Sequence, residues 1–330
     1  MKAAATASSW ARSAHPTSRW PGYTLALAAI IVTLAGTALW IVGGRLVAPN
    51  PTLVGARSAQ LDTQTLRITQ LDGPTLAGWF IPGTQPDGAV LLLHGLRADR
   101  RQMLGRARFL HAAGYAVLMI DLQAHGETPG THIGFGRPES RDVRSAIVWL
   151  RKRLPDQPIG VIGVSLGGAA ALLGDTPVDA DALVLESVYS SIEHAVENRL
   201  ALHLGAVGRH LAPLLLWQIE PRLGISSAQL QPLQAIAKLQ SPLLLIAGSG
   251  DRRTVLAESL ALFKRAPAPK KLWIVAGATH QDLHRHSPQR YEATVLAFLQ
   301  RFLRGRNPRP NPLPATTANA QVFSQATAAS

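Results

Sequence analysis

The chain has 330 residues, of which 47% are hydrophobic, and it contains no cysteine. This composition suffices for a large buried core, and the lack of thiols excludes disulfides, thiolate metal sites and a cysteine nucleophile. The net charge of +13 would suit a polyanionic partner, but eight of these charges lie in residues 1–58 and 304–330, and no arginine-rich helix, RNP motif or zinc-finger spacing occurs. We therefore expect no nucleic-acid partner; the composition leaves the oligomeric state open.

The first feature along the chain is an apolar segment that carries no charge over residues 24–42 and continues to Val47. We predict a transmembrane signal anchor over residues 23–47, since a helix of that length reaches ~37 Å and the hydrocarbon core of a bilayer is ~30 Å thick. The basic residues that precede it predict a cytoplasmic N-terminal segment (1–22) and a periplasmic or extracellular catalytic domain. They are Lys2, Arg12 and Arg19. A cleaved secretory signal and a buried helix are the alternatives.

After a predicted linker (48–58), short apolar runs alternate with helical patterns up to residue 304, and a polar, proline-rich segment (305–330) predicts a disordered tail. The alternation predicts an α/β domain over 59–304, with a mostly parallel eight-stranded sheet and helices on both faces. The predicted strands are residues 64–69, 76–81, 89–93, 115–120, 159–164, 182–185, 243–247 and 271–275. The arginines of residues 97–108 are typical of a solvated helix face, and we assign them no function.

One connection, residues 187–240, is too long for a simple crossover between strands. Its pattern is largely helical, with breaks at Pro213, Pro221 and Gly224. Insertions of this kind tend to lie over the carboxyl ends of the strands, where ligands bind. We predict a small helical cap over the active site.

The predicted strand at 159–164 runs into the motif Gly163–Val164–Ser165–Leu166–Gly167. A serine on a sharp turn from strand to helix needs small neighbours two positions away, because the strand and the helix pack closely there. The turn also places Ser165 at a helix N-terminus, where free amides favour an oxyanion. We predict that Ser165 is a nucleophile; an ordinary glycine-rich turn or a phosphate loop is the alternative.

The partners of such a serine are expected after later strands, in the order acid and then histidine. Asp251 follows the strand at 243–247, and His280 follows the strand at 271–275. We predict that His280 is the general base and that Asp251 orients it, although Asp251 is also placed to cap the helix that follows. Asp282 is too close to His280 in sequence to come from a separate strand, so we interpret it as a hydrogen-bonding loop residue.

Two further points concern the surroundings of this triad. The backbone amides of Leu96 and Leu166 are the candidate oxyanion donors, because one follows the strand at 89–93 and the other follows the serine. We expect His94 to be structural. A metal cluster of His280, Asp282, His284 and His286 is the alternative for the histidine-rich loop, but H-E-x-x-H is absent and we expect no metal and no cofactor.

Five segments together resemble the α/β-hydrolase superfamily. They are Leu-Leu-Leu-His94-Gly95, Asp121-Leu-Gln-Ala-His125-Gly126-Glu127, Gly-Val-Ser165-Leu-Gly-Gly, Gly-Ser-Gly-Asp251 and Gly-Ala-Thr-His280-Gln-Asp282. Within the superfamily the chain is most similar to membrane-anchored α/β-hydrolase-domain proteins near the prolyl-oligopeptidase and serine-aminopeptidase families. The resemblance implies an α/β-hydrolase fold preceded by one transmembrane helix, and a triad of Ser165, Asp251 and His280.

These observations predict a serine hydrolase that cleaves an ester, thioester or amide through an acyl-enzyme, with a carboxylesterase or lipase-like esterase as the first hypothesis. The expected partner is a small-molecule or lipid-like acyl substrate, with the membrane reached through the N-terminal helix. A serine exopeptidase or oligopeptidase and a catalytically silent, membrane-tethered binding protein are the alternatives.

Overall fold

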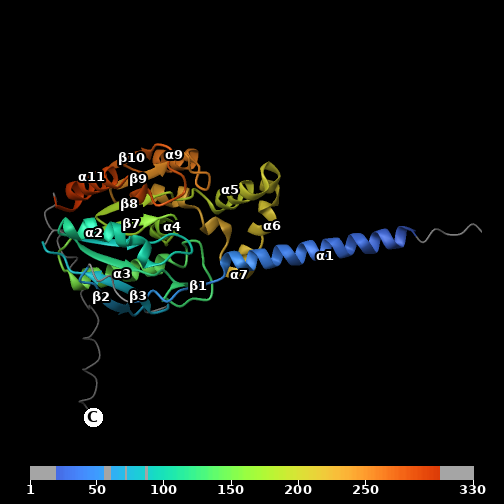
Figure 1. Ribbon diagram of the computed structural model, residues 1–330, viewed down its shortest axis with the longest axis horizontal. Helices are drawn as coiled ribbons and strands as arrows, with labels where there is room; N and C mark the ends of the chain where they lie inside the picture. The colour runs from blue at the N-terminus through green and yellow to red at the C-terminus, as the bar shows by residue number, and fades with distance from the viewer. Residues whose placement is uncertain (1–19, 56–60, 71–72, 86–87, 305–330) are drawn as a thin grey trace, which may run out of the picture.

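The computed structural model describes residues 20–55, 61–70, 73–85 and 88–304. The predicted N-terminal segment lies mostly outside the described residues, and so do the end of the predicted linker and the predicted tail. The described chain forms an α/β domain from which one long helix, α1 (Trp20–Val47), extends (Figure 1). Tyr23–Val47 is long and apolar enough to cross a membrane. The division of the chain into domains stays a prediction.

The domain is built on an eight-stranded sheet with the order β10-β9-β8-β7-β4-β5-β3-β2. Neighbouring strands from β10 to β5 are parallel, whereas β3 pairs antiparallel with both β5 and β2. Six of the strands are buried along their whole length, which is why they read as continuous apolar runs in the sequence. The strands are β2 (Gln64–Ile68), β3 (Leu76–Ile81), β4 (Ala89–Leu93), β5 (Ala116–Ile120), β7 (Ile159–Val164), β8 (Ala182–Glu186), β9 (Leu243–Gly248) and β10 (Lys270–Val275).

Helices cover both faces of this sheet, and each face has its own apolar cluster. One cluster includes side chains of α3 (Ser140–Arg153), α4 (Leu166–Leu172) and α9 (Leu256–Arg265). The other includes side chains of α2 (Leu104–Ala112), α10 (Leu283–His286) and α11 (Pro288–Leu299). The 3-10 turn η1 (Arg100–Met103) leads into α2, and a π-helical turn η5 (Gln300–Arg304) follows α11. The mostly parallel sheet with helices on both faces is confirmed.

The connection between β8 and β9 is helical, as predicted, and lies beside the end of α1 (Figure 1). We call residues 187–240 the cap. Its elements are α5 (Ile192–Leu204), η2 (Ala206–Leu211), α6 (Ala212–Leu216), α7 (Ile219–Leu223), η3 (Ser227–Gln229), α8 (Pro232–Ala235) and η4 (Ile236–Lys238).

The residues that follow α1 are hydrogen-bonded to the α/β domain. Asn50 and Pro51 form β1, which pairs with β6 (His125–Gly126), and the amide of Ile133 donates to the carbonyl of Val47 at 2.8 Å. The first residues of the predicted linker (48–58) are therefore paired with the domain, while the bounds of the linker stay a prediction. Proline and asparagine are typical of a linker, but they also suit a short edge strand whose amides are not all needed for pairing.

Candidate functional site

The first part of the candidate site is the turn between β7 and α4. Ser165 adopts φ 49° and ψ −108°, and its amide donates to the carbonyl of Glu186 at 2.8 Å. A Cβ on Gly163 would lie 2.6 Å from the amide nitrogen of Gly168, and a Cβ on Gly167 would lie 2.6 Å from the carbonyl oxygen of Leu93. Only glycine fits at these two positions, which is the physical reason for the Gly-x-Ser-x-Gly spacing.

The second part is a carboxylate and imidazole pair. Asp251 follows β9 and His280 follows β10, and Nδ1 of His280 lies 2.8 Å from Oδ2 of Asp251. Burial would raise the pKa of Asp251, but the hydrogen bonds from His280 and Thr254 outweigh it and hold the pKa below its ordinary value. Asp251 is 4% exposed and therefore forms a buried, ionised partner for a partly exposed ring.

Asp251 is not the cap of the helix that follows, because α9 begins at Leu256 and its N-cap is Val255, which makes no side-chain cap bond. Asp251 closes the turn before that helix instead. Its Oδ1 accepts from the amides of Arg253 and Thr254 at 2.8 and 3.0 Å, and its Oδ2 accepts from the hydroxyl of Thr254 at 2.7 Å. The Oδ1 atom of Asp251 therefore closes the turn while its Oδ2 atom faces His280. Thr254 was not predicted as a site residue, although a hydroxyl three residues after the acid is visible in the sequence.

Ser165, Asp251 and His280 follow strands β7, β9 and β10, which run parallel in one sheet, so all three lie at the same edge. The structure joins Asp251 to His280. Within the described residues, the hydroxyl of Ser165 forms no hydrogen bond with either of them. Such bonds are often long before substrate is bound.

The segment after β4 carries the other predicted oxyanion donor. His94 is fully buried; its Nδ1 lies 2.8 Å from the carbonyl of Gly95, and its Nε2 accepts from the amide of Leu122 at 3.0 Å. Burial lowers the pKa of His94 to about 4, so the ring is neutral and donates through Nδ1. The amide of Gly95 donates to Oε1 of Gln102 at 2.7 Å, and these bonds fix the backbone that leads to Leu96. His94 is structural in this arrangement, as expected.

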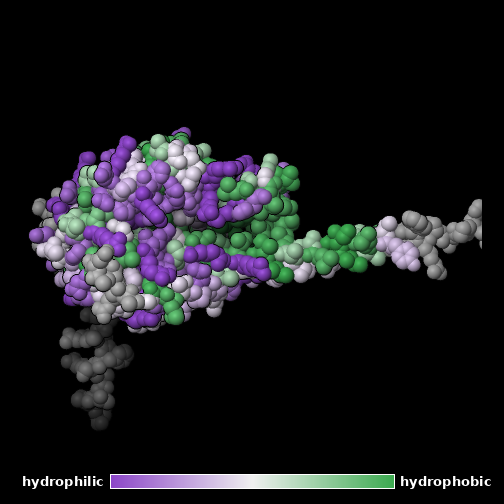
Figure 2. Space-filling model, viewed as in Figure 1, coloured by the Kyte–Doolittle hydropathy of each residue, from purple (hydrophilic) through white to green (hydrophobic). Residues whose placement is uncertain are grey.

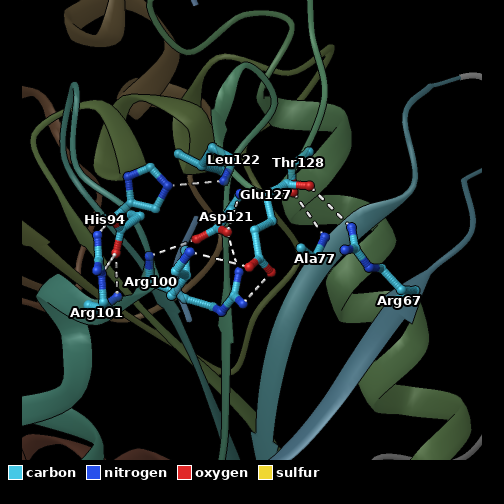
Figure 3. A network of polar contacts seen from close by, with 11 residues as sticks. Arg67, Ala77, His94, Arg100, Arg101, Asp121, Leu122, Glu127 and Thr128 are labelled. Atoms are coloured by element: carbon cyan, nitrogen blue, oxygen red, sulfur yellow. Dashed lines mark hydrogen bonds and ion pairs between the residues drawn. The ribbon is translucent and has the colours of Figure 1, made fainter. Parts of the chain in front are cut away.

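A buried ion-pair network connects the segment after β4 to the loop after β5 (Figure 3). Asp121 accepts from the backbone amide of Arg100 at 2.8 Å and pairs with its guanidinium, which reaches Glu127 at 2.7 Å. Burial raises the pKa of Asp121 above its ordinary value despite the opposing effect of Arg100. The hydroxyl of Thr128 closes the loop by donating to the carbonyl of Asp121 at 2.7 Å. The loops after β4 and β5 therefore form one connected unit.

A second buried network connects the serine turn to the histidine loop. Arg106 on α2 donates to both carboxylate oxygens of Glu186, at 3.0 and 2.7 Å, and lies 2.9 Å from Oδ1 of Asp282. Glu186 ends β8 opposite Val164, one residue before Ser165, and Asp282 begins α10, two residues after His280. Burial opposes the charged form, but the carboxylate of Glu186 holds the pKa of Arg106 well above its ordinary value.

The interpretation of residues 97–108 as a solvated basic face is therefore wrong for Arg100 and Arg106, each of which is 1% exposed. Their partners are distant in sequence, so the local charge pattern gave no sign of the pairing. Asp282 is a loop hydrogen-bonding residue, as interpreted, and its carboxylate also caps α10 by accepting from the amide of His284 at 3.1 Å.

The histidine-rich loop gives no metal cluster in the part of the chain that the structure describes. His284 bonds to Glu292 at 2.8 Å, His286 bonds to Gln281 at 2.8 Å, and Asp282 pairs with Arg106. These side chains are directed to separate partners and do not converge on one point.

A small, mostly apolar pocket lies where the end of α1 meets the cap. Its lining includes Leu46 and Val47 from α1, Phe135 from the loop before α3, and Val196, Leu215 and Ile219 from the cap. The N-terminal helix thus contributes side chains to a cavity of the hydrolase domain.

Comparison with known proteins identifies a family model and relatives that this chain resembles. The family model described as serine aminopeptidase, S33, matches residues 84–231. The uncharacterized protein Rv2307c of Mycobacterium tuberculosis is 30% identical over 271 residues, which cover 79% of this chain and 83% of that protein. The uncharacterized protein YqkD of Bacillus subtilis is 22% identical, and the match covers 73% of this chain and 80% of that protein.

Solved structures agree. The Pyrococcus furiosus esterase Pf2001 aligns with a TM-score of 0.64 and 25% identity, over 78% of this chain and 100% of that chain. The Pyrococcus horikoshii acylaminoacyl peptidase shares the fold, with a TM-score of 0.56 and 18% identity over 76% of this chain and 43% of that chain. The chain therefore belongs to the α/β-hydrolase superfamily and is a hydrolase.

Proposed function

We propose that the protein is a serine hydrolase that cleaves an ester through an acyl-enzyme formed on Ser165. The observation that carries this proposal is the 2.8 Å hydrogen bond between Asp251 and His280, at the sheet edge where Ser165 occupies a strained turn. An ionised carboxylate fixes the imidazole so that Nε2 is free to accept a proton.

In the proposed reaction the Oγ of Ser165 attacks the substrate carbonyl while His280 takes its proton. The tetrahedral oxyanion accepts hydrogen bonds from the amide of Leu166, at the first position of α4, and from the amide of Leu96. His280 then returns the proton to the leaving alkoxide. Water repeats the sequence on the acyl-enzyme, which releases the acid and restores Ser165.

We favour an ester as the substrate, because the Pyrococcus furiosus relative that is 25% identical over 78% of this chain is described as an esterase. An aminopeptidase or acylaminoacyl peptidase is the second candidate, since the family description and one structural relative carry those names.

We also propose that α1 anchors the protein in a membrane, with the N-terminus in the cytoplasm and the hydrolase domain on the other side. The support is the length and apolar character of Tyr23–Val47, together with the basic residues before it. A cleaved signal is the competing reading, and the mass of the protein isolated from membranes distinguishes the two.

A fluorophosphonate probe tests the nucleophile on the full chain in detergent. Wild type should be labelled, Ser165→Ala should not, and Ser145→Ala, which changes a serine on α3, should be labelled like wild type. Labelling of Ser165→Ala at the wild-type rate would refute the assignment. A panel of p-nitrophenyl esters against aminoacyl-p-nitroanilides then decides between esterase and peptidase.

A further inference from the structure

The cap carries a patch of exposed apolar side chains that the proposed chemistry does not use. We call Leu204, Val207, Leu211, Leu214 and Trp217 the cap patch; their exposed fractions range from 38% for Leu211 to 72% for Val207. Figure 2 shows apolar surface over the cap that continues onto α1. Contiguous exposed apolar surface on a folded protein marks a site of contact with another apolar phase.

The cap is fixed to α1 by direct contacts. Nε2 of Gln218 donates to the carbonyl of Leu39 at 3.2 Å, and Arg222 donates to the carbonyl of Trp40 while its guanidinium lies 3.9 Å from the centroid of that ring. Trp217 of the cap patch lies against Trp40, with ring centroids 6.3 Å apart. The cap patch therefore has a set height along α1.

That height decides what covers the cap patch. From Tyr23 to Ala38, before the first contact with the cap, α1 is ~24 Å long, whereas a hydrocarbon core is ~30 Å thick. To span the core, α1 must stay in the bilayer for about one further turn, and this turn contains Leu39 and Trp40, which touch the cap. The cap side chains at the same level then lie at the membrane surface, where tryptophan is enriched.

The charges around the cap patch suit the same surroundings. Arg209 and His210 are exposed in η2, between Val207 and Leu211. An apolar face with basic residues beside it is typical of helices that lie in the headgroup region of a bilayer.

We propose that the cap patch inserts into the membrane that α1 spans, so that the cap of the hydrolase domain lies on the bilayer and its substrate is an ester drawn from the lipid phase. This inference rests on the proposed anchor and deepens the proposed function by naming the source of the substrate. A second copy of the chain could cover the same side chains, and the experiment below separates the two.

Because the chain has no cysteine, a single introduced thiol is a unique site for a fluorescent label. The full-length chain is reconstituted in phosphatidylethanolamine and phosphatidylglycerol vesicles that contain lipids with a doxyl quencher at a shallow or at a deep acyl position. Leu214→Cys reports on the cap patch, and Leu34→Cys reports on α1. Leu260→Cys on α9 is the matched control, since Leu260 is 44% exposed and Leu214 is 50% exposed.

We expect the label at Leu214→Cys to be quenched, more strongly by the shallow than by the deep doxyl group. The label at Leu34→Cys should be quenched most by the deep group, and the label at Leu260→Cys by neither. Quenching at Leu34→Cys without quenching at Leu214→Cys would overturn membrane insertion of the cap and leave the anchor standing. Loss of quenching at both would overturn the anchor itself.

Self-association is detected in the same samples. If the emission of the Leu214→Cys label shifts to the blue without lipid quenching, and the shift disappears as the protein is diluted in lipid, a second copy covers the cap patch and the proposal is wrong. The fluorophosphonate test of wild type against Ser165→Ala does not depend on where the cap patch lies. Failure of the catalytic proposal is therefore distinguishable from failure of the membrane proposal.

Discussion

Removal of Arg106 tests how the serine turn and the histidine loop are held together. Arg106 and Glu186 are each 1% exposed and joined by two hydrogen bonds, and Arg106 also pairs with Asp282. Breaking one side of a buried pair leaves an uncompensated charge, which destabilises a protein by about 3–5 kcal/mol. For a domain of this size we expect Arg106→Met to lower Tm by roughly 10 °C.

The assay is thermal unfolding of the full chain in detergent, followed by circular dichroism, together with kcat on a p-nitrophenyl ester. Arg108→Met is the matched control, because Arg108 is exposed on the same helix. The double variant Arg106→Met/Glu186→Leu should recover part of the lost stability, since two apolar residues can replace a buried pair but the hydroxyl of Tyr291 loses its bonds to both. We expect Arg106→Met to lower kcat, because Asp282 in the histidine loop loses its partner. The double variant should have the same low kcat, because Asp282 still lacks that partner. Equal Tm values for Arg106→Met and Arg108→Met would refute the reasoning.

Three further changes probe separate parts of the site. Gly167→Ala places a Cβ 2.6 Å from the carbonyl oxygen of Leu93, so we expect kcat to fall while esters with different leaving groups lose rate alike; an unchanged kcat would contradict the close packing of the turn. Thr254→Val removes a 2.7 Å hydrogen bond to Asp251, worth about 1 kcal/mol, and should lower kcat/KM about five-fold, which a kinetic comparison with wild type checks. Burial raises the pKa of Asp142 to about 7, so this carboxyl stabilises the fold at low pH and loses that contribution as pH rises towards the folded-state pKa. Between about pH 5 and pH 8, wild type should therefore lose about 3 kcal/mol of unfolding free energy that Asp142→Asn keeps, as measured by urea denaturation; parallel pH profiles would contradict this.

The sheet was predictable because its strands are buried on both faces and short loops interrupt the apolar runs. The predicted strand at 89–93 coincides with β4, and the one at 159–164 coincides with β7. The position of Ser165 on a turn from strand to helix followed from glycine spacing, which is a local steric rule. Its catalytic role stays a prediction.

Long-range pairing was not predictable from the same patterns. Arg106 and Glu186 are 80 residues apart, and nothing in either local segment indicates that the two side chains form a buried ion pair. The contact between Gln218 and α1 spans 179 residues and depends on where the cap folds back, which apolar periodicity does not encode. Charge clusters are therefore weak evidence of exposure when their partners come from other strands.

The junction after α1 has a mechanical consequence. The helix has 28 residues, so it is ~42 Å long, and its last residues are bonded to the domain through Val47 and β1. A helix that ends in such bonds passes its tilt to the body attached to it, and transmembrane helices tilt as bilayer thickness changes. With the proposed anchor and the proposed insertion of the cap, we expect the thickness of the surrounding bilayer to alter the angle at which the cap meets the lipid, and so to adjust access to the enzyme without any ligand.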